Sequence, residues 1–236
     1  MSITSNTGSA RAGSWAPEPV KRVLRPLVQW IGVRYNRAEA LWYDIKNKTD
    51  TTGSVPAAGL DIPDDLTTHV TGFQSVNEHY LRRVLEEVGF PDGSVFVDIG
   101  CGKGKALLIA AEYPFIRKVV GVELAESLCR VSEANIEIAR ARLGFDKPAE
   151  VIHGDAVAID YSGGENIFFL NNPFDAEFMK IFIDKMEESA RRQPRKIWML
   201  YGNPAHANTI AQDGRLKLVR EFKFFGPGRN ITVFEL

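Results

Sequence analysis

Residues 95–104 read Val-Phe-Val-Asp-Ile-Gly-Cys-Gly-Lys-Gly, an apolar run that leads directly into three closely spaced glycines. Short apolar runs of this kind are typical of strands that are covered on both faces of a sheet. Glycines let the backbone approach a ligand closely, and a helix that starts behind them offers free N–H groups. The stretch therefore predicts a central strand of an α/β fold and a binding site for an adenosine-type cofactor.

Strand and helix patterns alternate around this stretch. The predicted strands are 95–99, 118–122, 149–153, 166–170 and 196–201, and the predicted helices are 75–88, 103–112, 126–142 and 175–190. Strands separated by helices form a parallel sheet that is covered on both faces. The last two apolar runs, 216–225 and 230–236, are joined by Gly226-Pro227-Gly228 and predict an antiparallel hairpin. The predicted fold class is therefore α/β: a doubly wound, mostly parallel seven-stranded sheet with an antiparallel C-terminal hairpin, plus an N-terminal helical extension.

The chain ahead of the sheet has a different pattern. Residues 1–17 are polar and aperiodic, which predicts a mobile tail. Apolar residues then recur at helical spacing from 20 to 31, and Pro26 is expected to start or kink this helix. A second, short helix is predicted over 37–46, with Asn36 as its cap.

Basic charge gathers in this part of the chain. Residues 1–48 hold eight Lys and Arg against three Asp and Glu, a local charge of +5, which leaves −6 for the remainder. Trp30, Trp42 and Tyr43 favour packing against the body of the protein. The segment is predicted to be a helical cover or a substrate-site lid, and the alternative is a surface for an acidic partner, nucleic acid or a membrane. We divide the chain into this tail and basic helical extension, 1–48, and a catalytic domain, 49–236.

Length and composition exclude several classes of protein. The chain has 236 residues, 44% of them hydrophobic, and a formal charge of −1, which argues against binding of bulk nucleic acid. Cys101 and Cys129 lack the spacing of a metal site, so no metal is expected and a reducing compartment is the simpler interpretation. No leader-like or membrane-spanning apolar stretch is present, and we expect a cytoplasmic protein. Residues 49–71 are rich in turn formers and predict a loop.

Two acidic residues sharpen the glycine signal. Asp98 stands just before the first glycine, where a carboxylate could bind the cationic ammonium group of a methionine moiety. Glu123 ends the second predicted strand, about 20 residues after the glycines, where an acid accepts hydrogen bonds from ribose hydroxyls. The pair favours a cofactor that carries both a ribose and a positive charge.

At these residues the sequence resembles the class I S-adenosylmethionine-dependent methyltransferases. Residues 98–104, Asp-Ile-Gly-Cys-Gly-Lys-Gly, are similar to the family's D/E-x-G-x-G-x-G motif, and the match covers about 73–236. The resemblance implies S-adenosylmethionine as cofactor, S-adenosylhomocysteine as product, and adenine contacts at Leu124 and Asp155. The implied cofactor-binding residues are Phe73, Gln74, Asp98, Gly100, Cys101, Gly102, Gly104, Glu123, Leu124, Asp155, Ala156 and Asn171.

The loop after the fourth predicted strand carries a second motif. Asn171-Asn172-Pro173-Phe174 resembles the N/D-P-P-Y/F motif of methyltransferases that act on amino groups, although Asn172 replaces the first proline. Similar Asn-Asn loops occur in histone-type lysine methyltransferases of this fold. The resemblance implies that these four residues are catalytic and that the unidentified acceptor offers a nitrogen on a protein or small molecule. Asparagines that only form a turn remain a competing interpretation.

Two other functions remain open at this point. One is a catalytically silent S-adenosylmethionine-binding interaction module. The other is a nicotinamide-dependent oxidoreductase, although the glycines have the spacing G-x-G-x-G and lack the G-x-G-x-x-G spacing of dinucleotide sites. The histidines are scattered, and only His206, in the loop after the fifth strand, stays a candidate base. Cys101 is interpreted as a small filler of the core.

Overall fold

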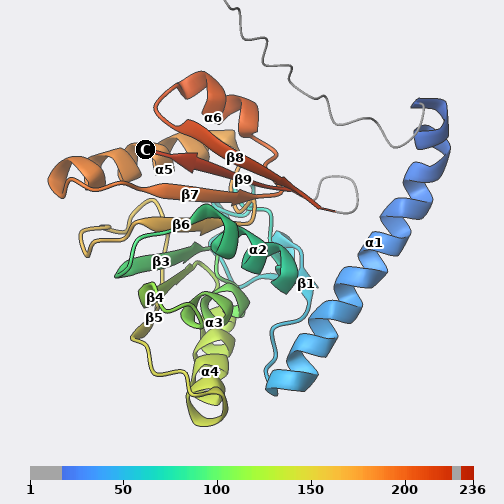
Figure 1. Cartoon of the computed structure of the whole chain (residues 1–236), viewed down its shortest axis with the longest axis horizontal. Helices are drawn as coiled ribbons and strands as arrows, with labels where there is room; N and C mark the ends of the chain where they lie inside the picture. Colours follow the sequence, from blue (N-terminus) through green and yellow to red (C-terminus); the bar gives the residue numbers. More distant parts are fainter. Residues whose placement is uncertain (1–17, 225–229) are drawn as a thin grey trace, which may run out of the picture.

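The structure is a computed structural model and describes residues 18–224 and 230–236. Seven strands of these residues form one sheet in the spatial order β5-β4-β3-β6-β7-β9-β8 (Figure 1). The strands are β3 (Ser94–Ile99), β4 (Ile116–Glu123), β5 (Ala149–His153), β6 (Ile167–Leu170), β7 (Trp198–Gly202), β8 (Lys217–Lys223) and β9 (Asn230–Glu235). The neighbouring strands β5, β4, β3, β6 and β7 are all parallel to one another. Strand β9 runs antiparallel to both β7 and β8. The predicted fold class is confirmed.

Helices cover both faces of the sheet, and each face has its own apolar core. The helices of the body are α2 (Glu78–Val88), α3 (Lys105–Ala111), α4 (Glu126–Leu143), α5 (Ala176–Arg192) and α6 (Ala207–Asp213). Leu81 of α2, Leu107 of α3 and Ile136 of α4 belong to one core. Phe182 of α5 and Ile210 of α6 belong to the other. Burial on both sides explains the nearly unbroken apolar strands, of which β3 is buried at all six positions.

Some elements have no clear pattern in the sequence. Helix α6 buries only Ile210, so it lacks an apolar stripe. Strands β1 (Ser54–Val55) and β2 (Phe73–Gln74) pair antiparallel and close the segment between them, which also holds the short 3-10 helix η1 (Ala57–Gly59). The predicted loop 49–71 is therefore held at both ends. The predicted tail 1–17 and the turn Gly226-Pro227-Gly228 lie outside the described residues.

The N-terminal extension differs from its prediction. Residues Glu18–Asn47 form one continuous helix, α1, with Pro26 inside it, where two helices were predicted. A proline removes one backbone N–H donor, but the turns on either side keep their hydrogen bonds, so the helix continues through Pro26. Asn36 does not cap a helix, because it lies mid-helix and its Oδ1 accepts a hydrogen bond from Asn77 Nδ2 at 3.1 Å. The division of the chain after residue 48 stays a prediction.

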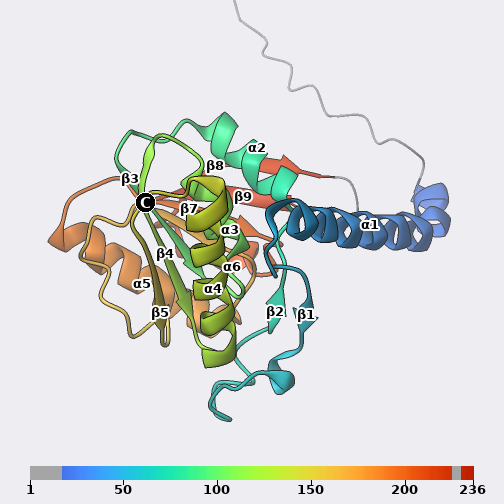
Figure 2. The same ribbon diagram turned by 90° about the horizontal axis from the view of Figure 1, so that it is seen from below.

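Helix α1 extends away from the sheet and the other helices (Figure 2). Its inner side buries Ala40 and Tyr43, as predicted for the tyrosine. The predicted packing of Trp30 and Trp42 is wrong, because these side chains are 55% and 65% exposed. The body of the protein packs against one side of α1, and the two tryptophans project from the other side. No helix among the described residues combines the length and the apolar character needed to cross a membrane.

Candidate cofactor and acceptor site

The carboxyl ends of β3, β4, β5 and β6 lie at one edge of the sheet, as parallel strands require. Two adjoining cavities at this edge, here called the cofactor cleft, share Phe73, Gln74, Gly100 and Asn171 in their walls. The predicted residues that line the cofactor cleft are Phe73, Gln74, Asp98, Gly100, Cys101, Glu123, Leu124, Asp155, Ala156, Asn171, Pro173 and Phe174. Of the other predicted residues, Gly102 and Gly104 form the turn beside it.

The glycine turn has a backbone that side chains would disrupt. Gly102 has a φ of +54°, and its N–H donates a hydrogen bond of 2.8 Å to Glu123 Oε2. A Cβ on Gly102 would lie 2.3 Å from the ring of Phe73. Gly104 has a φ of +81° and caps α3, and a Cβ there would lie 2.4 Å from Ser132 Oγ. The left-handed conformation and the close contacts together require glycine at both positions.

Glu123 connects this turn to the start of α4. Its second oxygen, Oε1, accepts a hydrogen bond of 2.9 Å from the N–H of Ala125. Burial raises the pKa of Glu123, although the bonds from Ala125 and Gly102 act in the opposite direction. Each carboxylate oxygen keeps a further lone pair, so the group can still accept hydrogen bonds from a ligand.

Asp98 is buried at the end of β3, with 4% of its surface exposed. Its carboxylate has no hydrogen-bond or ion-pair partner within residues 18–224 and 230–236. Burial, followed by the nearby charge of Glu123, raises the pKa of Asp98 well above its ordinary value. A carboxylate that is buried without a partner is costly, and a cationic ligand would remove that cost.

A second, larger cavity lies beside the cofactor cleft, with a volume of about 560 Å³. We call it the acceptor cavity. Gly72, Phe73, Gln74 and Asn171 line both spaces. The side-chain amides that line the acceptor cavity come from Asn36, Gln74, Asn77, Asn171, Asn172, Asn203 and Asn230. Among the described residues its wall has no Asp, Glu, Lys or Arg, so it is polar and uncharged.

The two adjacent asparagines have different surroundings. Asn171 Oδ1 accepts a hydrogen bond of 2.8 Å from Asn203 Nδ2, and its own Nδ2 lies 3.4 Å from the Gln74 carbonyl oxygen. Asn172 has a φ of +53°, and its Oδ1 accepts a hydrogen bond of 2.8 Å from the Tyr201 hydroxyl. The positive φ of Asn172 favours the turn-forming interpretation, although Asn172 also lines the acceptor cavity. Asn171 lines both cavities. Pro173 and Phe174 line the cofactor cleft rather than the acceptor cavity.

Two other candidates lie outside the polar wall. The Cys101 thiol is buried, and burial, with the charges of Asp98 and Glu123, raises its pKa, so the thiol is protonated and suits a filler. His206 lines neither cavity, and its backbone N–H donates to the Tyr201 hydroxyl at 3.4 Å.

Comparisons with known proteins find similarity to proteins of methylation. Residues 66–154 match the family model described as "Histone methylation protein DOT1". A curated protein-lysine N-methyltransferase from Saccharolobus islandicus (strain REY15A) is 31% identical over 97 residues. The match covers 40% of this chain and 58% of that relative, so the chain spans little more than half of the relative's length.

Solved structures share the fold at lower identity. The methyltransferase domain of bacterial CtHen1-CN has a TM-score of 0.51 and 17% identity, covering 67% of this chain and 97% of that one. A putative RNA methyltransferase from Pyrococcus horikoshii has a TM-score of 0.52 and 15% identity, covering 75% of this chain and 90% of that one. These solved structures show that the chain has the fold of class I methyltransferases, and the family model matches the part of it that holds the glycine turn and Glu123. The similarity to methyltransferases supports S-adenosylmethionine, the cofactor that the sequence predicts.

The charge of Asp98 fits this cofactor. S-adenosylmethionine carries an ammonium group and a sulfonium, and Asp98, when ionised, would offer them an anion in the wall of the cofactor cleft. Since the pKa of Asp98 is raised by burial, cofactor binding must favour loss of its proton.

We expect cofactor affinity to fall as the pH is lowered through the raised pKa of Asp98. A bound cation stabilises the ionised carboxylate, so binding releases a proton at pH values between the pKa of Asp98 in the complex and its raised pKa in the free protein. Asp98→Asn should weaken binding by about 1–3 kcal/mol and remove this proton release. Calorimetry in buffers of different ionisation enthalpy measures both quantities. Glu123→Gln is the comparison variant, and equal proton release by parent and Asp98→Asn would contradict the assignment.

Residues 60–73, here called the lid segment, cross the cofactor cleft in a stretch that the sequence predicted as a loop. Its apolar side chains that line the cleft are Leu60, Ile62, Leu66, Val70 and Phe73. Asp61 accepts hydrogen bonds from the Ser127 N–H at 2.8 Å and the Ser127 hydroxyl at 2.5 Å. Near the other end, His69 Nδ1 donates to Asp175 Oδ2 at 2.6 Å. The lid segment is thus tied to the starts of α4 and α5.

The cleft beneath the lid segment is narrow. Its larger part has a volume of about 70 Å³, whereas pockets for small ligands usually measure roughly 300–1,000 Å³. The ring of Phe73 lies against Gly102 and takes up space beside the glycine turn. We therefore expect the lid segment to move when a cofactor enters and leaves.

Breaking the contact between His69 and Asp175 is expected to speed cofactor release. His69→Ala removes the side-chain bond to Asp175 and the stacking on Phe178, where ring centroids are 4.6 Å apart. We expect the dissociation rate to rise about fivefold with little change in melting temperature, since the bond holds a surface segment and is worth about 1 kcal/mol. Stopped-flow fluorescence measures the rate. His79→Ala, at an exposed position of α2, is the control, and an unchanged rate in His69→Ala would show that this end does not limit release.

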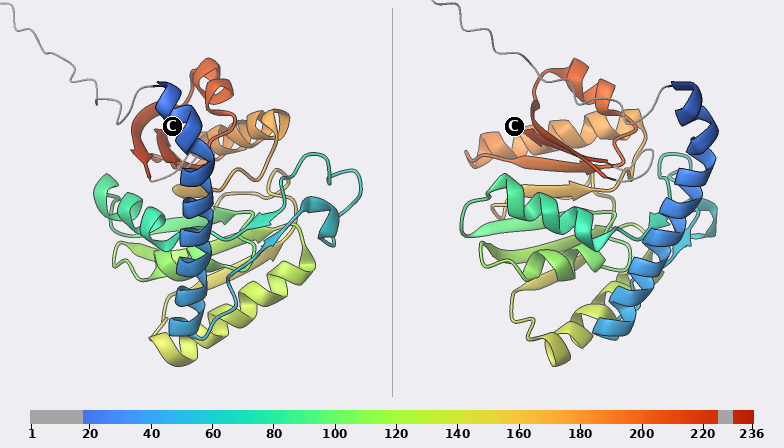
Figure 3. Two further views of the ribbon diagram at one scale, coloured as in Figure 1. Left: turned by 90° about the vertical axis from the view of Figure 1, so that its right-hand side faces the viewer. Right: turned by 45° about the vertical axis from the view of Figure 1, so that its right-hand side comes forward.

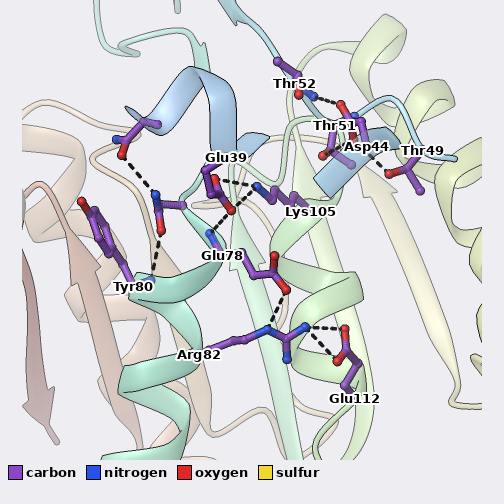
Figure 4. A network of polar contacts seen from close by, with 12 residues as sticks. Glu39, Asp44, Thr49, Thr51, Thr52, Glu78, Tyr80, Arg82, Lys105 and Glu112 are labelled. Atoms are coloured by element: carbon purple, nitrogen blue, oxygen red, sulfur yellow. Dashed lines mark hydrogen bonds and ion pairs between the residues drawn. The ribbon is translucent and has the colours of Figure 1, made fainter. Parts of the chain in front are cut away.

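The helix α1 reaches the glycine turn through a buried polar network (Figure 4). Glu39 Oε1 accepts hydrogen bonds from the Glu78 N–H at 3.0 Å and from Lys105 Nζ at 3.2 Å. The Lys105 and Glu39 side chains are 3% and 6% exposed, and Lys105 Nζ lies 4.5 Å from the centre of the Tyr43 ring. Because Lys105 is the first residue of α3 and lines the cleft, this ion pair ties α1 to the cofactor side of the sheet.

The loop that follows α1 is held in a similar way. Asp44 accepts hydrogen bonds from the N–H groups of Thr51 and Thr52, both at 2.8 Å. Lys103, within the glycine turn, donates to Asp50 at 2.7 Å and to the Thr52 carbonyl at 3.0 Å. Sequence reasoning missed these residues, because no local pattern links them to positions far away in the chain.

Proposed function

We propose that the chain transfers a methyl group from S-adenosylmethionine to the side-chain amine of a lysine in a protein. The observation that carries the proposal is the uncharged, amide-lined acceptor cavity, which shares Asn171 and Phe73 with the cofactor cleft. The similarity to a protein-lysine N-methyltransferase and to the family model for histone methylation supports a protein acceptor.

The uncharged wall suits an amine that must react as a neutral base. When bound, the cofactor would supply a methyl group on a sulfonium; the amine lone pair would bond to the methyl carbon in line as the C–S bond breaks, and S-adenosylhomocysteine would leave. A protonated lysine has no free lone pair, and a wall without carboxylates offers its charge no counterion, so the cavity favours the neutral amine. Asn171 can orient that amine by hydrogen bonds without taking its proton, and alignment is then the main contribution of the protein.

Within this proposal five of the predicted residues bind the two ends of the cofactor. Asp98 pairs with the ammonium group of the cofactor, and Glu123 accepts from the ribose. Leu124, Asp155 and Ala156 form the adenine end. We also propose a cytoplasmic location, which the two buried cysteines without a disulfide partner support.

Asn171→Ala is expected to reduce turnover at least about tenfold, or about 1.4 kcal/mol, while cofactor affinity changes less. The amide stands between the two cavities, so its loss affects alignment more than binding. Asn208→Ala, an exposed position on α6, is the matched control. Parental turnover in Asn171→Ala would remove the catalytic role of the loop.

The experiment that tests the function itself is transfer of labelled methyl groups into fractionated cell protein. Protease-sensitive label that hydrolyses to methyl-lysine supports the proposal. Label in small molecules would assign a different acceptor, and cofactor binding with no transfer to any fraction would favour the silent binding module.

A further inference from the structure

The outward side of α1 carries a row of large apolar side chains that are exposed in the described structure. These residues, here called the outer stripe, are Val23, Leu27, Trp30, Ile31, Leu41, Trp42 and Ile45, and their exposed fractions range from 42% to 77%. Successive members lie 4, 3, 1, 10, 1 and 3 residues apart, and at about 3.6 residues per turn all of them fall on one side of the helix. The buried Tyr43 and Ala40 lie on the other side, so α1 has two apolar faces and only one of them is covered.

The position of α1 leaves this face accessible along its length. Figure 3 shows the helix standing at the margin of the molecule, with its N-terminal half beyond the sheet and helices of the body. Exposed apolar patches of this extent mark surfaces that bind a partner or a membrane. The outer stripe therefore calls for an apolar occupant.

The charges around the outer stripe are of one sign. Arg34 lies in the middle of the row, with its guanidinium 4.3 Å from the centre of the Trp30 ring, and Arg37 and Lys46 are also exposed. The carboxylates of this part of α1 are directed elsewhere, because Glu39 is buried against Lys105 and Asp44 is bonded to the threonines that follow the helix. Among the described side chains of α1, the outer face is apolar with cations only.

We propose that the outer stripe binds the surface of an anionic lipid bilayer, with α1 lying in the plane of the headgroups. A helix with tryptophan and aliphatic side chains beside arginine and lysine matches that surface, because the apolar groups enter the acyl boundary and the cations meet lipid phosphates. This inference rests on α1 and holds independently of the methyl acceptor.

A second copy of the chain fits the stripe less well. The stripe runs from Val23 to Ile45, and Arg34 stands at its centre. Pairing of two such helices, parallel or antiparallel about that centre, would place one Arg34 guanidinium against the other. Burial of the apolar side chains would then bring two like charges together, which repel each other. An anionic bilayer instead buries the apolar side chains and attracts the cations.

Flotation of the full chain with lipid vesicles tests the proposal. We expect binding to vesicles that contain phosphatidylglycerol and much weaker binding to pure phosphatidylcholine. Trp30→Ser with Trp42→Ser, and separately Arg34→Glu with Arg37→Glu, should each reduce bound protein at least about tenfold. Leu218→Ser is the matched control, since Leu218 is a large apolar side chain with 62% exposure that belongs to β8 and not to α1.

Circular dichroism and cofactor affinity confirm that each variant is folded. Absence of binding by the parent, or equal binding by the parent and the double tryptophan variant, would overturn the proposal. Sedimentation velocity covers the competing occupant: a dimer that Trp30→Ser with Trp42→Ser converts to monomer, without vesicle binding by the parent, would assign the stripe to a second copy.

Discussion

Gly102→Val is expected to reduce the affinity for S-adenosylmethionine at least about 100-fold, or about 2.8 kcal/mol. Gly102 has a φ of +54°, a conformation that branched side chains avoid, and a Cβ there would lie 2.3 Å from the Phe73 ring. Its N–H also donates to Glu123, so a shift of this backbone moves the proposed ribose-binding carboxylate. One substitution thus disturbs the turn, the lid segment and an acidic residue together.

Gly144→Val separates this local effect from backbone strain. Gly144 ends α4 with a φ of +68°, and nothing lies within 4 Å of the position of its Cβ. Both variants carry the cost of a left-handed valine, roughly 1–2 kcal/mol in stability, and only Gly102→Val should lose the cofactor. Calorimetric titration and thermal melts measure the two effects. Parental binding by Gly102→Val would place the cofactor elsewhere.

Glu39→Ala is expected to destabilise the fold by about 3–5 kcal/mol, because it leaves the ammonium group of Lys105 buried without its partner. The two side chains are 3% and 6% exposed, so water cannot replace the lost carboxylate without a rearrangement. The Glu78 N–H at the start of α2 loses an acceptor as well. Denaturant titration of the free energy of unfolding measures the loss.

Two further variants and the pH dependence check this explanation. Glu39→Ala combined with Lys105→Met should recover much of the lost stability, and Glu150→Ala, which breaks the exposed pair with Lys118, should cost no more than about 1 kcal/mol. Burial lowers the pKa of Lys105, although Glu39 opposes the shift. The unfolded chain then binds more protons than the folded one between the lowered pKa and about 10.4, so the deficit of Glu39→Ala should shrink as the pH rises through that window. A deficit that is the same at every pH would show that loss of the charge partner is not its cause.

Local pattern predicted most of the cofactor side of the site. The apolar run and the glycines predicted β3 and the turn after it. The number of residues between the glycines and Glu123 matched one crossover through a helix. This crossover places Glu123 Oε2 2.8 Å from the Gly102 backbone nitrogen. The acceptor side was less determined. Asn171 and Asn172 are identical in the sequence, and only the positive φ of Asn172 and its bond to Tyr201 show that one of them shapes the turn.

The sequence by itself determined the order of the seven strands of the main sheet and of helices α2 to α5, the antiparallel ending of the sheet, and the resemblance to class I methyltransferases, because these depend on periodicity and on short motifs. Only the tertiary structure decided that α1 is one helix whose tryptophans face outward, that residues 60–73 cover the cofactor cleft, and that Glu39 meets Lys105 across 66 positions of the chain. The physical reason is that a buried pair or a covered cleft depends on which distant surfaces pack together. Helical or strand periodicity records that a face is apolar, and it does not record what lies against that face.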